Sequence, residues 1–134
     1  MIAPHFQTLA LPHEGTSTAS NLLDRVDCWR KEATRKLQQS QRGAKGQFLT
    51  PCSVASLMAR MFEFNCQDIS LLDAGAGIGS LLAAVVCELC QRQNRPRSLH
   101  VTAYEIDLIL IQLATRKHQA LAITEKTAAL ICEI

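Results

Sequence analysis

The sequence has no apolar run long enough to cross a membrane. A transmembrane helix needs about 20 consecutive apolar residues, and no stretch of this 134-residue chain approaches that length. The beginning of the chain also lacks the hydrophobic core of a secretion signal, because histidines, a glutamate and a Ser/Thr cluster interrupt it. With 48% hydrophobic and 19% charged residues, the composition is not that of a disordered segment. We therefore expect a globular cytoplasmic protein without a membrane partner.

Several common catalytic and metal-binding arrangements are missing as well. The four histidines are not part of a Ser-His-Asp order, and no phosphate-binding P-loop lysine is present. The sequence Cys87-Glu-Leu-Cys90 has no second cysteine pair nearby to complete a zinc site. It also lies late in a predicted helix, where a thiolate is not stabilised. We expect reduced, packed thiols, and we assign neither a metal site nor a catalytic residue.

Positive charge is concentrated in one part of the chain. The net charge is only +2, yet residues 25–45 hold seven of the fourteen Lys and Arg residues, opposed by Asp27 and Glu32. Such a stretch is typical of a surface that binds a polyanion, although a solvated helix face is the simpler explanation of an isolated charge run. The candidate nucleic-acid-binding residues are Arg30, Lys31, Arg35, Lys36, Arg42 and Lys45.

Residues 1–64 are expected to be irregular at first and then helical. Residues 1–17 contain two prolines and a glycine without periodicity, which predicts an irregular leader. Residues 18–64 form a helical segment in which a first helix runs from Thr18 or Ser20 to about Gln39. Thr50-Pro51 is a typical start for a second helix, with the Thr50 hydroxyl as its cap. The apolar stripe of the first helix consists of Leu22, Val26, Trp29, Ala33 and Leu37.

Residues 65–134 alternate between strand and helix patterns. We predict a strand over 69–73, a glycine turn and a helix to about Arg92, a strand over 99–105 and a helix over 107–120. The last residues, 128–134, begin a third strand or extend a helix. This order is typical of an α/β fold with a parallel sheet. So small a sheet leaves an edge unpaired, so we expect further chain, a complementary chain or self-association, and a dimer if the chain folds alone.

The most informative motif is Asp73-Ala74-Gly75-Ala76-Gly77-Ile78-Gly79, between a predicted strand and a predicted helix. Glycines there allow close approach of a ligand, and the helix start offers free amides. A dinucleotide site has the spacing Gly-x-Gly-x-x-Gly, whereas here the spacing is Gly-x-Gly-x-Gly after an acid. This pattern indicates S-adenosylmethionine, whose ammonium group Asp73 can reach, while a pyrophosphate would be repelled.

A second acid is expected where the next strand ends. Glu105 closes the predicted strand 99–105, and its carboxylate can accept hydrogen bonds from vicinal ribose hydroxyls. Its neighbour Ile106 can pack on an adenine ring. Asp107 is a competing candidate for the ribose, but we expect it to cap the following helix.

Three segments follow one another along the chain: Gly46-Gln47-Phe48-Leu49-Thr50-Pro51, the glycine motif, and Tyr104-Glu105-Ile106-Asp107. Over roughly residues 25–125 this order resembles the amino-terminal half of N6-adenine-specific DNA methyltransferases of restriction–modification systems. The resemblance implies a partial Rossmann-like, class I S-adenosylmethionine-dependent methyltransferase fold, preceded by an N-terminal helical segment. It also implies that Phe48 and Thr50 contact the methionine part of the cofactor, and that DNA is the partner.

The chain departs from that family in one respect. Family members carry a tetrapeptide of the type Asn/Asp/Ser-Pro-Pro-aromatic, which grips the flipped adenine, but the four prolines here are never adjacent. The resemblance therefore implies the cofactor-binding portion of such an enzyme, inactive alone. Two alternatives remain open at this point: a truncated module that binds nucleic acid or a partner without catalysis, and a methyltransferase acting on RNA, protein or small molecules.

Overall fold

The computed structural model describes residues 7–10, 16–37, 47–63 and 65–124. Along them the order is β1 (Gln7–Ala10), α1 (Thr16–Lys36), α3 (Cys52–Arg60), β2 (Asp68–Asp73), α4 (Ser80–Gln91), β3 (Ser98–Ala103) and α5 (Leu108–Thr124). None of these helices has the length and hydropathy that a bilayer crossing requires. The predicted strand or helix at 128–134 lies outside the described residues.

The sheet has the order β1-β3-β2, so that β3 lies between two partners. Strands β2 and β3 run parallel with Asp73 opposite Ala103, which agrees with the predicted strand-helix-strand unit. Strand β1 pairs antiparallel with β3, and this contradicts the expected irregular leader over residues 1–17. The leader prediction failed because β1 is defined by pairing with a distant strand and not by a periodicity of its own. The division at residues 18–64 and 65–134 into separate units stays a prediction.

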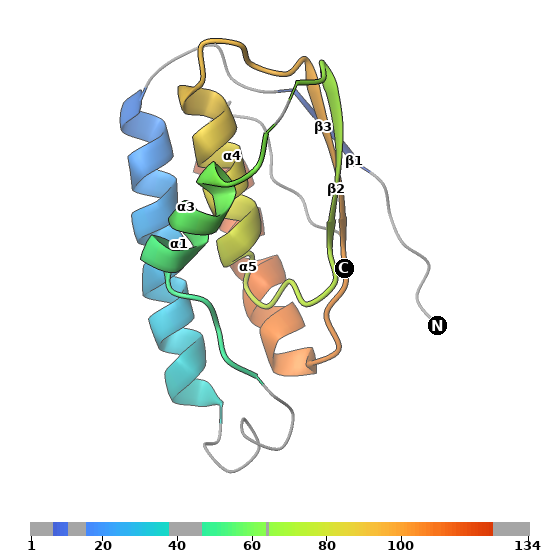
Figure 1. Ribbon diagram of the computed structural model, residues 1–134. Coiled ribbons are helices and arrows are strands. Elements are labelled where there is room, and N and C mark those ends of the chain that lie inside the picture. Colours follow the sequence, from blue (N-terminus) through green and yellow to red (C-terminus); the bar gives the residue numbers. More distant parts are fainter. Residues whose placement is uncertain (1–6, 11–15, 38–46, 64, 125–134) are drawn as a thin grey trace.

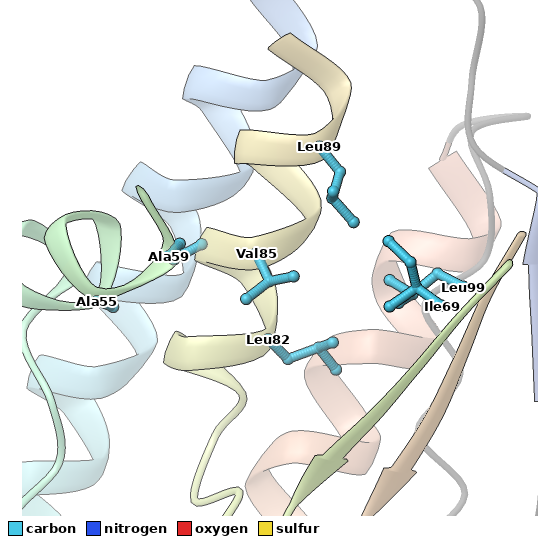
Figure 2. Close-up of a cluster of buried hydrophobic side chains, with 8 residues drawn as sticks. Ala55, Ala59, Ile69, Leu82, Val85, Leu89 and Leu99 are labelled. Atoms are coloured by element: carbon cyan, nitrogen blue, oxygen red, sulfur yellow. The ribbon is translucent and has the colours of Figure 1, made fainter. Parts of the chain in front are cut away.

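Helix α4 is buried on most of its surface because it lies between the sheet and two other helices. It packs against both α1 and α3, and Figure 1 shows these helices on one side of the sheet. In Figure 2, Leu82 and Val85 of α4 lie between the alanines of α3 and the strand residues Ile69 and Leu99. The Cys87 side chain is also buried, and burial raises the pKa of its thiol to about 12. Cys87 is therefore a packed thiol, as predicted.

The apolar stripe of α1 packs inward as predicted, with Val26, Ala33 and Leu37 buried against α4 and α5 residues. Helix α1 begins at Thr16, earlier than the predicted Thr18 or Ser20, and ends at Lys36. Strand β3 is shorter than predicted and ends at Ala103, which leaves Glu105 in the following loop.

Helix α3 buries small residues and exposes large apolar ones. Ala55 and Ala59 are its buried residues, whereas its large apolar side chains are exposed. The helix ends at Arg60, because the amides of Met61 and Phe62 bond to carbonyls only three residues earlier and tighten the last turn. The exposed large side chains on and just after α3 are Val54, Leu57, Met58, Met61 and Phe62.

Candidate cofactor-binding site

The two predicted acidic residues lie at the same edge of the sheet. Hydrogen bonds from Tyr104 N to Asp73 O, of 2.8 Å, and from Ala76 N to Tyr104 O, of 3.0 Å, continue the β2–β3 pairing into the loops. Glu105 therefore follows β3 beside the turn that follows β2, and the Gly77 amide of that turn donates a hydrogen bond to it. This edge, at the carboxyl ends of parallel strands, is where α/β sheets bind ligands.

Two glycines of the turn are required by the protein's own backbone. Gly77 and Gly79 have φ values of 59° and 86°, which L side chains rarely adopt. Gly79 is the N-cap of α4, and the Gly77 amide donates a 2.8 Å hydrogen bond to Glu105 Oε2. A Cβ at position 77 would lie 3.0 Å from Leu49 Cδ2, so the turn and the segment that carries Leu49 are in contact.

Gly75 is different, because nothing in the described chain requires a glycine there. Its φ is not positive, and a Cβ built on it meets no atom within 4 Å. The residue is exposed at the outer side of the turn. Open space beside a glycine at a strand end is a feature expected where a ligand approaches the backbone closely.

One carboxylate oxygen of Asp73 is buried and accepts no hydrogen bond from the described residues. Among the residues that the structure describes, none donates a hydrogen bond to Asp73 Oδ2, although this atom is shielded from solvent. Burial raises the pKa of Asp73, and the charge of Glu105 raises it further, against the opposing effect of the Gly75 amide. A buried, unsatisfied acceptor costs stability. The Asp73 Oδ2 atom is therefore available to accept a hydrogen bond from a cationic donor, such as the ammonium group of a methionine moiety.

Glu105 is held in one orientation by backbone amides. Its Oε2 accepts from Gly77, and its Oε1 accepts from Ile106 and Asp107, each at 2.8 Å. Asp107 caps α5, as predicted, because its Oδ1 accepts from the amides of Ile109 and Leu110 at 2.9 and 3.4 Å. A carboxylate offers about four acceptor positions, so Glu105 retains capacity for a further donor.

Residues 47–51 form neither a helix nor a strand, and they reach this edge through Leu49, which lies against Gly77. Leu49 packs in the cluster that includes Ile78 and Leu110. Phe48 is 81% exposed, and Ile106, from the loop after β3, is 88% exposed. Large apolar side chains exposed beside a polar site are available to cover a ligand.

Thr50 does not cap α3, which corrects the sequence prediction. The N-cap residue is Pro51, without a side-chain hydrogen bond. Asp27 of α1 takes that role instead, since its Oδ1 accepts a long 3.5 Å hydrogen bond from Cys52 N. Because this hydrogen-bond acceptor comes from α1, the residues around the start of α3 do not reveal it.

The candidate nucleic-acid-binding residues are largely paired within α1. Arg30 and Lys31 both contact Asp27 at 2.8 Å, and Lys36 contacts Glu32 at 2.7 Å. Arg35 is exposed. Arg42 and Lys45 lie outside the described residues. The pairs reduce the net positive charge that α1 presents, and the assignment of these residues to nucleic acid stays a prediction.

Sequence reasoning missed Gln47 and Leu49, two residues that connect the 47–51 segment to the site. Gln47 Nε2 donates a 2.8 Å hydrogen bond to Asp107 Oδ2 across 60 positions of sequence. Leu49 lies against Gly77. Phe48 and Thr50, in the same segment, were predicted from a resemblance. The contacts of Gln47 and Leu49 are long-range, so only the fold reveals them.

The part of the chain that forms this site is similar to a known protein family. Residues 33–123, more than half of the chain, match the family described as N-6 DNA Methylase. The chain belongs to the N-6 DNA methylase family. The matched range contains the 47–51 segment, the glycine turn and the loop with Glu105, so the predicted resemblance to N6-adenine DNA methyltransferases of restriction–modification systems is confirmed.

Two curated relatives are type II methyltransferases. The chain is 38% identical to Type II methyltransferase M.PstI of Providencia stuartii over 86 residues, which cover 64% of this chain and 17% of the relative. It is 42% identical to Type II methyltransferase M.BsuBI of Bacillus subtilis over 66 residues, covering 48% of this chain and 13% of the relative. The chain thus matches less than a fifth of the length of each relative. No solved structure matches it significantly.

The mixed helix and strand structure, with one parallel strand pair, is compatible with part of a methyltransferase fold.

Proposed function

We propose that this chain is the S-adenosylmethionine-binding portion of an adenine-specific (N6) DNA methyltransferase with a Rossmann-like, class I fold. The observation that carries the proposal is the buried Asp73 Oδ2, which no described residue satisfies, beside the open space at Gly75. Membership of the N-6 DNA methylase family supports the choice of ligand and of substrate.

In this proposal each end of the cofactor has its own acidic residue. Asp73 binds the ammonium group of the methionine moiety, and Glu105, held by three backbone amides, accepts from the ribose hydroxyls. Gly75, Gly77 and Gly79 keep the backbone close to the ligand. Ile106 covers the adenine ring, and Phe48 and Thr50 contact the methionine part.

The bound cofactor supplies an electrophilic methyl group on a sulfonium. The residues named here bind and orient it and exclude water from it, whereas further chain or a partner supplies the pocket for the target adenine. We therefore expect the isolated chain to bind cofactor and to transfer no methyl group.

Isothermal titration calorimetry with S-adenosylhomocysteine tests the binding role of Asp73. The variant Asp73→Asn keeps the shape of the side chain but removes its charge, so the affinity falls by about 10- to 100-fold, the loss expected for one charge-assisted hydrogen bond. Asp24→Asn, at an exposed position of α1, is the matched control and leaves the affinity unchanged. Equal affinities for wild type and Asp73→Asn contradict the assignment.

DNA binding is a separate part of the proposal. The cations of α1 lie on a helix of this chain and provide a sequence-independent contact with phosphates. A variant that combines Arg35→Ala with Lys36→Ala lowers the affinity for duplex DNA and reduces the slope of log affinity against log salt by about 2. The control combines Arg60→Ala with Arg116→Ala, which removes two exposed cations elsewhere. An equal loss in both double variants argues against a DNA contact through α1.

A non-catalytic module that binds nucleic acid is the alternative. It predicts DNA binding in the same assay but no affinity for S-adenosylhomocysteine, so calorimetry distinguishes the two functions.

A further inference from the structure

Residues 47–51 are not held in place by the backbone hydrogen bonds of a helix or a strand. These residues belong to neither a helix nor a strand, and Pro51 has an extended conformation with φ −60° and ψ 145°. Yet the segment carries Phe48 and Thr50, which the proposed function assigns to the cofactor. Ordering an irregular segment costs conformational entropy, so its position depends on side-chain contacts.

One such contact connects Gln47 to a distant helix start. Gln47 Nε2 lies 2.8 Å from Asp107 Oδ2, and Asp107 is only 6% exposed. The other oxygen of Asp107 caps α5, which fixes the carboxylate in place. A hydrogen bond from an amide to a largely buried carboxylate is stronger than one between neutral groups.

Asp107 also belongs, through its backbone amide, to a continuous chain of contacts around the site. The Asp107 amide donates to Glu105 Oε1, and Glu105 Oε2 accepts from Gly77. Leu49, two residues after Gln47, lies against the same Gly77. The contacts connect the 47–51 segment, the loop after β3 and the glycine turn in a closed circuit.

We propose that Gln47 and Asp107 are positioning residues, and that their hydrogen bond holds residues 48–50 over the cofactor site before the ligand arrives. This inference rests on the proposed function for its ligand, but it concerns a contact within the chain itself. Neither residue touches the cofactor. Their effect on binding comes from preorganisation, since a segment that is already ordered loses less entropy when the ligand binds.

A swap of donor and acceptor tests the pair. In Gln47→Glu the donor becomes a second carboxylate facing Asp107, so the hydrogen bond is lost. In the double variant Gln47→Glu/Asp107→Asn the amide and the carboxylate exchange places, so a hydrogen bond forms again. Asn at position 107 also remains a good helix cap. The control is Gln112→Glu, which makes the same charge change at an exposed position of α5.

Two readouts are measured on every variant. Backbone ¹⁵N order parameters of residues 48–50 in the ligand-free chain report the order of the segment, and calorimetry with S-adenosylhomocysteine reports the affinity. For Gln47→Glu we expect the order parameters at 48–50 to fall from about 0.85 to below about 0.6 and the affinity to be about tenfold weaker. In the double variant the order parameters return to the wild-type values and the affinity to within about threefold of the wild type, whereas Gln112→Glu changes neither.

The inference is overturned if Gln47→Glu has the same order parameters at 48–50 as Gln112→Glu, or if the double variant fails to recover while its thermal midpoint equals that of the wild type. Failure of the proposed function is recognised separately. If the wild-type chain binds no S-adenosylhomocysteine, the function is wrong, and the order parameters alone still decide whether the Gln47–Asp107 hydrogen bond orders the segment.

Discussion

Leu49 and Gly77, which are 28 positions apart in the sequence, lie in direct contact: a Cβ at position 77 would be 3.0 Å from Leu49 Cδ2. The glycine turn therefore has two kinds of glycine. Gly77 serves the packing and backbone conformation of the protein itself, whereas the space at Gly75 is open to a ligand. This difference provides a way to separate stability from binding.

Gly77→Ala and Gly75→Ala are expected to have opposite effects. Alanine at position 77, where φ is 59°, lowers the free energy of unfolding by about 1–2 kcal/mol or more, because of the left-handed conformation and the contact with Leu49. Alanine at position 75 leaves it unchanged or raises it by up to about 1 kcal/mol, yet weakens S-adenosylhomocysteine binding at least tenfold. Urea unfolding and calorimetry measure the two quantities. Comparable losses of stability in both variants would rule out this distinction.

The stability of the chain is expected to depend on Asp73 in a pH-dependent way. The folded-state pKa of Asp73 is raised. The contribution of Asp73 to the free energy of unfolding is therefore fully present below the unfolded pKa of about 3.9, and it is lost as the pH rises through the folded pKa. Without ligand, Asp73→Asn is therefore more stable than the wild type at pH 7, and the difference shrinks towards pH 4. Thermal midpoints between pH 4 and 8 measure it. A structural role for the charge would give the opposite order at pH 7.

Asp27 is expected to show the reverse pH dependence. Hydrogen bonds from Arg30 and Lys31 hold the pKa of Asp27 well below its usual range, and Asp27 also accepts from the start of α3. Its contribution is present above about pH 4 and is lost as the pH falls through the folded pKa. Asp27→Asn lowers the free energy of unfolding at pH 7 by about 1–2 kcal/mol. Equal pH profiles for the wild type and Asp27→Asn between pH 3 and 7 would contradict this, and Asp24→Asn is the control.

The sequence predicts self-association through an open sheet edge. Strand β2 is an edge strand of the described sheet, and Leu72 on it is 64% exposed and lines a shallow hollow together with Met58 and Phe62. We expect a dimer, and Leu72→Lys to shift it towards the monomer, since an edge lysine opposes strand pairing. Leu108→Lys, an equally polar change at a 71% exposed residue of α5, leaves it unchanged. A monomeric sedimentation profile of the wild type at all concentrations would disprove the expectation.

Much of the fold was predictable because it is encoded locally. The apolar stripe of α1, the short apolar strand before Asp73 and the glycine spacing each occupy a continuous stretch, and the structure has α1, β2 and the turn there. That Asp73 at the end of β2 and Glu105 just after β3 lie at the same edge of the sheet followed from the parallel connection. These features depend on residues close together in the sequence.

The features that could not be predicted depend on residues far apart in the sequence. Strand β1 exists through its pairing with β3. The cap of α3 comes from Asp27 on another helix, and the Gln47–Asp107 hydrogen bond spans 60 positions. In α3, burial follows the two alanines and not the larger apolar residues, because helices α1 and α4 approach closely on that side. Periodicity identifies an apolar face but not the distance of its neighbours.

The central claim is that a cofactor binds between the glycine turn and the loop after β3. The most direct measurement is a ¹⁵N–¹H correlation spectrum of the wild-type chain titrated with S-adenosylhomocysteine, with Asp73→Asn and Asp24→Asn as matched samples. We predict saturable shifts at the amides of Gly75, Gly77 and Ile106 in the wild type and in Asp24→Asn, and greatly weakened shifts in Asp73→Asn. Saturable shifts confined to other parts of the chain, or no shifts at millimolar ligand, would contradict the account.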